Sequence, residues 1–447
     1  MDDSGDNSYK STTNKPMPKN KIKKGFISRS FTTAKLSTRL GMGAARKLLK
    51  VNADNPEKAV EVAAKLVSEF DGMKGLMMKF GQMASYLGTQ MPPEARQMLA
   101  TLQSSSTAME FDEVRALIEA ELKAPIESRF DAFDETAFAA ASIGQVHKAV
   151  VNGKPVAVKV QYPDIEKLLS MDLKLVGNMF TVFMAGTSMP GKAMAQELRA
   201  RLLEECDYEL EAQNQLKIRA LCENTASEHI PDVLLSHSSR RVLTTEFCTG
   251  QNFQDFCKTA PQELKNQAGL NIFIHTMNAI FRHCYFNGDP HPGNYLFHQD
   301  GRVTFLDFGC IKKFHPEYIY RWKAMAKSIL EQNKTDNLHA TDAMGLIGRM
   351  KAFDHDYHWE LMNHVYTPFK TDAPFAFSHE FNAKTTSLMI WENKNKFSGA
   401  MPADFLFINR LQWGLAAILA DMKAEAVFSE PFREAVYADA VPLFEPN

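Results

Sequence analysis

The apolar residues of this chain change their spacing along its length, and each spacing predicts a different element. Between residues 55 and 87 they recur at about every third or fourth place, which is typical of an amphipathic helix. The positions are Val62, Leu66, Phe70, Met73, Met77 and Phe80. The pair Pro92-Pro93 interrupts the pattern, and helical spacing resumes near 94–103 and 111–123. These residues predict an all-helical N-terminal segment.

From about residue 128 the apolar positions take the spacing of β-strands. Strands are predicted at 130–140, 145–151, 155–161, 233–236 and 242–247. Asn152-Gly153 joins the second and third of them and is a strong signal for a tight hairpin. Helical spacing lies between the third and fourth, at 164–186 and 191–222, and returns after Gly250. A small sheet followed by a helical half predicts an α+β fold with two lobes.

The composition is that of a globular protein larger than one ordinary domain. The chain has 447 residues, of which 45% are hydrophobic and 23% are charged. No run of 18 apolar residues without charge occurs, so we expect no membrane-spanning helix. The six cysteines form no Cys-x-x-Cys pair, which favours reduced thiols and a cytoplasmic location.

The N-terminal stretch is basic although the net charge of the whole chain is −2. After Asp2, Asp3 and Asp6, residues 10–50 contain twelve lysines and arginines and no acid. We expect residues 1–50 to be a largely disordered tail, with peripheral contact to an anionic lipid surface as the alternative, since each basic side chain there gains about 1 kcal/mol. The acidic start disfavours a transit peptide, although a mitochondrial location stays open if the source is eukaryotic. No folded basic face predicts nucleic-acid binding.

The most informative motif is Asn-Gly-Asp-Pro-His-Pro-Gly-Asn, which is followed by Asp-Phe-Gly at 307–309. Its Asp289 and Asn294 are separated from Asp307 by two apolar runs that meet at an Asp-Gly turn. We therefore expect a hairpin with Asn294 and Asp307 at neighbouring strand ends. This order of residues is typical of kinase-type sites, which need a carboxylate near the acceptor oxygen and two oxygen ligands for Mg²⁺.

Two further segments fit a nucleotide site between the lobes. Val-Ala-Val-Lys at 156–159 is a strand whose Lys159 can reach phosphates, although a surface lysine is the simpler interpretation without context. Small residues at 139–144 stand where a glycine-rich phosphate loop would lie, or they form a plain turn; only Gly144 matches one of its glycines. A glutamate should hold the lysine, and the acidic run at 204–214 offers several that periodicity does not separate.

Six segments in this order resemble the UbiB/AarF family of atypical kinases over residues 60–320. They are Lys79-Phe80-Gly81-Gln82, Ala-Ala-Ala-Ser-Ile-Gly-Gln-Val-His, Val-Ala-Val-Lys-Val-Gln-Tyr-Pro, Glu-Cys-Asp-Tyr, Asp-Pro-His-Pro-Gly-Asn and Leu-Asp-Phe-Gly. That family includes mitochondrial proteins that support coenzyme Q synthesis. The resemblance implies a bilobal protein-kinase-like fold whose cleft is covered by an N-terminal all-helical extension. The implied units are a tail at 1–50, the extension at 51–125, an N-lobe at 126–250 and a C-lobe at 251–447.

The resemblance also implies roles for individual residues. Asp289 and Lys159 are the catalytic pair, Asn294 and Asp307 bind Mg²⁺, and Lys159 meets Glu211 and the phosphates of ATP. The remaining ATP-binding positions are Ala139, Ala140, Ala141, Ser142, Gly144, Glu246 and Cys248. A regulatory cover motif consists of Lys79, Gly81, Gln82, Glu205 and Asp207. In this motif the resemblance implies that Glu205 and Asp207 contact Lys79 and Gln82.

The function expected from this set is an atypical kinase or ATPase that uses ATP and Mg²⁺ and supports ubiquinone biosynthesis or lipid homeostasis. Its acceptor would be a small or lipid-related molecule such as a quinone precursor. One alternative is a nucleotide-regulated lipid-binding scaffold whose turnover is incidental. Another is a conventional protein kinase, which is disfavoured because no Arg precedes Asp289 and no Ala-Pro-Glu follows Asp307.

Overall fold

The computed structural model describes residues 109–141, 143–167, 200, 203–222, 225–288, 290–400 and 402–445, without the side chains of 403–411. The basic tail, the helices predicted before residue 104 and the helix predicted at 164–186 lie largely or wholly outside this part. So do five of the predicted site residues. These are Lys79, Gly81, Gln82, Ser142 and Asp289.

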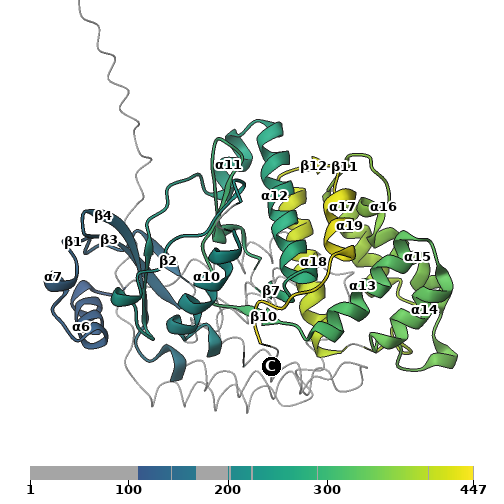
Figure 1. The fold of residues 1–447 in the computed structure, drawn as a ribbon, viewed down its shortest axis with the longest axis horizontal. Coiled ribbons are helices and arrows are strands. Elements are labelled where there is room, and N and C mark those ends of the chain that lie inside the picture. Colours follow the sequence, from purple (N-terminus) through teal and green to yellow (C-terminus); the bar gives the residue numbers. More distant parts are fainter. Residues whose placement is uncertain are drawn as a thin grey trace, which may run out of the picture.

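An antiparallel sheet forms the N-lobe, drawn in blue and teal at the left of Figure 1. Its strands are β1 (Ala132–Phe133), β2 (Ala139–Ala141), β3 (Gly144–Val151), β4 (Lys154–Gln161) and β6 (Val242–Glu246). They run in the order β1-β3-β4-β6, and β2 also pairs with β3. The predicted hairpin is confirmed, since β3 and β4 pair throughout and Asn152 and Gly153 turn with φ of 50° and 72°.

Helix α6 (Phe111–Leu122), followed by the short α7 (Ile126–Arg129), packs against one face of this sheet. Its buried positions are Val114, Leu117, Ile118 and Leu122, which is the spacing of one helical face. They share a hydrophobic core with the alternate β4 residues Val156, Val158 and Val160. Because strand side chains alternate between faces, the residues between these valines point away from this core.

Two predicted strands differ from the structure. The strand expected at 130–140 is divided into β1 and β2 by a bend at 134–138. The strand expected at 233–236 is reduced to a bridge at Val233 and then a 3₁₀ turn at Leu235–His237. There the hydroxyl of Ser238 donates to the Leu234 carbonyl at 2.9 Å, and such local side-chain bonds compete with a strand ladder.

The C-lobe is mainly helical and occupies the right of Figure 1. Its helices are α11 (Phe253–Thr259), α12 (Gln262–Phe281), α13 (Pro316–Leu330), α14 (Lys334–Ala343), α15 (His355–Val365), α16 (Thr367–Lys370), α17 (His379–Thr386), α18 (Ala403–Asp421) and α19 (Ser429–Tyr437). Short 3₁₀ turns lie at Pro292–Asn294 and Met350–Ala352, and a π-helical turn at Ser387–Trp391. Small sheets pair β5 (Glu228–His229), β8 (Tyr295–Phe297) and β9 (Val303–Phe305), β7 (Tyr285–Asn287) with β10 (Ile311–Lys313), and β11 (Phe375–Ala376) with β12 (Glu425–Ala426).

The hydrophobic cores follow this division. The large C-lobe core is built on α12, α13, α18 and α19 and is separate from the cores of the N-lobe. Helix α10 (Tyr208–Cys222) lies between the two lobes in Figure 1. The predicted bilobal α+β architecture is therefore confirmed. Of the helical extension predicted at 51–125, only residues 109–125 are described, and there α6 packs on the N-lobe sheet, so a cover over the cleft stays a prediction. Among the described residues, no helix is both long and apolar enough for a membrane span.

Candidate active site

Strand β4 positions Lys159 at the centre of the site. Its neighbours Val158 and Val160 face the core under α6, so the lysine side chain points to the opposite face, towards α10. Its Nζ lies 2.9 Å from both carboxylate oxygens of Glu211 and 3.9 Å from Oδ2 of Asp307. The same ammonium lies 4.8 Å from the centre of the Tyr208 ring. A strand of one lobe, a helix and the Asp-Phe-Gly segment thus meet at one cation.

Helix α10 supplies the glutamate from its first turn. Asp207 begins the helix, because its Oδ1 accepts a hydrogen bond from the Leu210 amide at 3.0 Å. Glu211 follows one turn later and its side chain is 1% exposed. Among the several acids of the run at 204–214, this is the one whose carboxylate pairs with Lys159.

Hydrogen bonds between side chains and the backbone fix the Asp-Phe-Gly segment. The Gly309 amide donates to Oδ1 of Asp307 at 3.0 Å, and the Asn287 side chain donates to the Asp307 carbonyl at 2.6 Å. Asn214 of α10 donates to the Phe308 carbonyl at 3.1 Å, while the Phe308 ring is buried in the C-lobe core. The carboxylate of Asp307 consequently points out of the core, towards Lys159, with 27% of its side chain exposed.

The predicted hairpin places Asn294 beside this segment. Tyr295 of β8 pairs with Phe305 of β9, and the Leu306 amide donates to the Asn294 carbonyl at 2.9 Å. Asn294 and Asp307 therefore lie at neighbouring strand ends, as the sequence predicts. Asp289 is outside the described residues, but the Gly288 amide just before it donates to the Cys310 carbonyl at 2.6 Å. The loop that carries Asp289 thus enters next to Asp-Phe-Gly.

The charged groups in this cluster shift one another's pKa values. Burial disfavours the ammonium of Lys159, but the carboxylates of Glu211 and Asp307 outweigh burial and hold its pKa well above the ordinary value. Burial raises the pKa of Glu211 to about 7, with Lys159 opposing the shift and Asp307 adding to it. Burial also raises the pKa of Tyr208 far above its usual range. The lysine is therefore a permanent cation, and the glutamate titrates near neutral pH.

The small-residue loop is a tight turn between β2 and β3. Ala141 pairs with Gly144, so two residues make the connection. Ile143 is buried beside Tyr208, and its carbonyl accepts from the Tyr162 amide at 2.9 Å. Gly144 packs directly against the Val160 carbonyl, where a β-carbon would overlap with the oxygen. Ala139, Ala140 and Ala141 thus form a short strand leading to a turn that is anchored to the start of α10.

Glu246 is the last residue of β6, and Cys248 lies just after it in the connection between the lobes. The carboxylate of Glu246 turns towards His229, whose Nε2 lies 3.2 Å away, and accepts from the Asp232 amide at 3.2 Å. The Cys248 thiol donates to the Glu246 carbonyl at 3.9 Å, and burial raises its pKa to about 12. Any contact of Glu246 with a nucleotide would therefore use the backbone of this segment and not its carboxylate.

The predicted cover motif is only partly described. Asp207 has a structural task as the cap of α10, and Glu205 lies in the turn that precedes it. Whether they meet Lys79 and Gln82 stays a prediction, because both partners lie outside the described residues. Three supporting residues were not singled out from the sequence. Tyr208 and Asn214 lie in the predicted acidic run and Asn287 precedes the Gly-Asp-Pro motif, but nothing in their spacing predicted these contacts.

The donor set suits a magnesium-bound triphosphate. The carboxylate of Asp307 and the side-chain amide of Asn294 are oxygen donors of the kind that Mg²⁺ prefers. Lys159 adds a cation held in place by a glutamate, which is the arrangement that kinase-type sites use for the α- and β-phosphates. The residues present therefore fit both ATP and the metal.

Comparisons with known proteins agree with this geometry. Residues 101–340 match the family described as the ABC1 atypical kinase-like domain. The chain is 26% identical to the mitochondrial atypical kinase COQ8 of Saccharomyces cerevisiae, over 91% of this chain and 84% of that protein. It is 30% identical to a probable protein kinase UbiB of Aeromonas hydrophila, over 54% of this chain and 45% of that protein. Several relatives are matched over about half of their length or less.

A solved structure shares the fold. It is a Mycobacterium tuberculosis protein, described as Rv3197 in complex with erythromycin, which superimposes with a TM-score of 0.64 at 24% sequence identity. The match covers 86% of this chain and 99% of that one. At this identity the likeness concerns the fold alone.

Proposed function

The chain belongs to the ABC1 atypical kinase-like family, and we propose that it transfers or hydrolyses the γ-phosphoryl group of Mg-ATP. The observation that carries the proposal is the convergence on Lys159, with Glu211 at 2.9 Å and Asp307 at 3.9 Å. A buried cation with a paired glutamate and a neighbouring metal-binding carboxylate is the recurring core of kinase-type sites.

We assign roles to four described residues and to Asp289, which lies outside the described part of the chain. Lys159 holds the α- and β-phosphates while Glu211 fixes its position, and Asp307 and Asn294 bind the metal. Mg²⁺, when bound, neutralises the charge of the phosphates and of the leaving ADP. Asp289 accepts the proton of the attacking hydroxyl or water. As the new bond from that oxygen to the γ-phosphorus forms, the bond to the bridging oxygen of ADP breaks.

Nucleotide binding tests the metal site directly. We expect Asp307→Asn to weaken Mg-ATP affinity by about 100-fold, because one anionic metal ligand is lost without a change of shape. Asp300→Asn is the matched control, since this carboxylate lies at the turn of the same hairpin and its side chain is 65% exposed. Calorimetric titration of both variants with Mg-ATP gives the answer. Equal affinity of wild type and Asp307→Asn would overturn the proposed function.

We further propose a small or lipid-related acceptor, in support of isoprenoid-quinone metabolism. The names of the relatives motivate this choice, because they include COQ8 and UbiB proteins. The basic stretch at 10–50 adds a peripheral contact with anionic lipid as a second proposal. ATP turnover should rise when anionic vesicles or a quinone precursor are added, and deletion of 1–50 should remove the effect of the vesicles alone. ATP turnover that changes with neither the vesicles nor the quinone precursor would contradict this assignment.

A nucleotide-regulated scaffold is the second candidate. The observation in its favour is the phosphate-loop position, where alanines and the buried Ile143 replace the mobile glycine-rich loop of ordinary kinases. In this case Asp289→Ala should leave cellular quinone levels normal, whereas Lys79→Ala should reduce them. If Asp289→Ala alone abolishes quinone synthesis at normal protein abundance, the scaffold proposal fails.

A further inference from the structure

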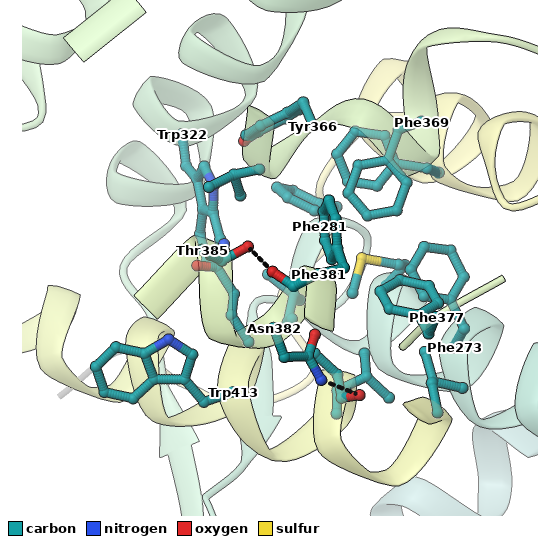
Figure 2. Close-up of a pocket in the computed structure, with 18 residues that line it drawn as sticks. Phe273, Phe281, Trp322, Tyr366, Phe369, Phe377, Phe381, Asn382, Thr385 and Trp413 are labelled. Atoms are coloured by element: carbon teal, nitrogen blue, oxygen red, sulfur yellow. Dashed lines mark hydrogen bonds between the residues drawn. The ribbon is translucent and has the colours of Figure 1, made fainter. Parts of the chain in front are cut away.

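The C-lobe contains an apolar cavity of about 90 Å³ that shares no residue with the Lys159 cluster. Figure 2 shows its aromatic wall, to which Phe281, Trp322, Phe369 and Phe377 contribute. These rings come from α12, α13, α16 and the segment before α17, and α18 closes the cavity with Trp413, Leu415 and Ala416. Segments far apart in sequence therefore converge on one space.

Such a space is unusual inside a closely packed protein. Interiors pack like organic crystals and leave few voids larger than a water molecule. For comparison, a roughly 150 Å³ cavity lined by apolar side chains stays dry and binds benzene. The cavity here is smaller but partly open, so it fits a single ring or a short branched chain whose remainder extends through the opening.

Among the described residues that line the cavity, one buried polar side-chain atom has no hydrogen-bond partner. Asn382 donates to the Ala416 carbonyl at 2.9 Å, and the Thr385 hydroxyl donates to the Phe381 carbonyl at 2.9 Å (Figure 2). The indole nitrogen of Trp413 is buried and finds no hydrogen-bond partner among the described residues. A buried donor without a partner costs about 1–3 kcal/mol. The cavity therefore combines an apolar wall with one lining residue, Trp413, whose buried N–H is unsatisfied.

The same helix joins the cavity to the loop that carries Asp289. Gly414 packs against Pro290 so closely that a β-carbon there would lie 2.5 Å from the Cγ of that proline. Leu415 lines both this cavity and a second, smaller space beside Asn287 and Pro290. One turn of α18 thus contacts the cavity on one side and the loop at 287–294 on the other.

We propose that this cavity is a binding site for a small apolar molecule that bears a hydrogen-bond-accepting oxygen. The apolar part occupies the space among the rings, and the oxygen accepts from the Trp413 indole. The occupant braces α18 and thereby reduces the mobility of the loop at 287–294.

Matched probes separate the two elements of the proposal. Cyclohexanone carries the acceptor, whereas methylenecyclohexane has the same shape with a CH₂ group in place of the oxygen. We expect the full-length protein to bind both probes saturably. Trp413→Phe should weaken the affinity for the ketone by about 5- to 10-fold and leave the affinity for the hydrocarbon unchanged. Ala416→Leu fills the cavity and should abolish binding of both probes. Trp391→Phe is the matched control, because Trp391 is 59% exposed and lies outside the cavity.

Saturation-transfer NMR measures the affinities of the two probes, and amide hydrogen exchange measures the mobility of the loop at 287–294. The ketone should slow amide exchange of 287–294 in the wild type but not in Ala416→Leu, while the strand at 145–151 serves as the internal reference. Retention of ketone binding in Ala416→Leu would overturn the site. Equal weakening of both probes by Trp413→Phe would overturn the role of the indole, and unchanged loop exchange would overturn the link through α18. None of these readouts requires catalysis, so they stand apart from the test of phosphoryl transfer.

Discussion

The charged cluster around Lys159 and the aromatic cavity of the C-lobe both lie among buried side chains, but the cluster is built from paired charges and the cavity from apolar rings. In the cluster, a cation and two carboxylates lie within 4 Å and satisfy one another. In the cavity, rings enclose the space and a single indole N–H has no partner among the described residues. The first arrangement suits a charged ligand that replaces one set of ion pairs with another. The second suits an apolar ligand, because no charge has to be desolvated.

The aromatic region should depend most strongly on packing. Phe281 is 2% exposed and packs edge-on against Trp322 at 5.0 Å and Phe432 at 5.8 Å. We expect Phe281→Ala to lower the free energy of unfolding by about 3–5 kcal/mol, because it enlarges a cavity that already exists. Urea denaturation measures this loss. The exposed Phe397 is the control, and Phe397→Ala should change stability by less than about 0.5 kcal/mol. Similar losses in the two variants would contradict the comparison.

Charge pairing should dominate the cluster. Lys159→Met leaves Glu211 buried without its cation, which we expect to lower stability by about 3 kcal/mol at pH 8. At pH 5 the loss should be smaller, because a protonated Glu211 needs no cation. Denaturation at both pH values checks this. Lys148→Met on the exposed side of β3 should cost little at either pH, and a pH-independent loss for Lys159→Met would show that packing, not charge, is responsible.

The titration of Glu211 gives a smaller and more specific effect. Its pKa is raised by burial from an ordinary 4.5 to about 7, so the folded protein binds a proton more tightly than the unfolded chain. This contribution to stability is complete below about pH 4.5 and is lost as the pH rises through about 7. Glu211→Gln should therefore flatten the fall in melting temperature over this range. The exposed Glu209 on the same helix is the control, since Glu209→Gln should follow the wild type.

Helix capping should give the smallest effect. Asp207→Ala removes the acceptor for the Leu210 amide and should cost about 1 kcal/mol, whereas Asp207→Ser retains a capping oxygen and should cost less. The pair of variants also separates capping from the predicted contact with Lys79 and Gln82, which needs the negative charge. If serine restores stability but not ATP turnover, the charge has a second task. Equal stability of the alanine and serine variants would exclude the capping role.

Much of this architecture follows from local sequence. Asn152-Gly153 predicted the central hairpin because both residues accept positive φ, and the Asp-Gly turn predicted the pairing of β8 with β9. The prediction of a strand at 233–236 was wrong beyond Leu234, because the chain there enters a 3₁₀ turn in which the Ser238 hydroxyl bonds to the Leu234 carbonyl. The resemblance to UbiB/AarF proteins is confirmed by the family match over 101–340.

The sequence by itself determined which chemical groups are available and the order in which they occur, since spacing and turn residues act within a few positions of each other. Only the tertiary structure decided which acid meets Lys159, because Glu211 lies 52 residues further along the chain and several other acids lie in the same run at 204–214. It likewise decided the cavity, whose walls come from helices that have no local reason to meet. Contacts of this kind arise when separate apolar faces are buried together, and burial depends on the whole chain.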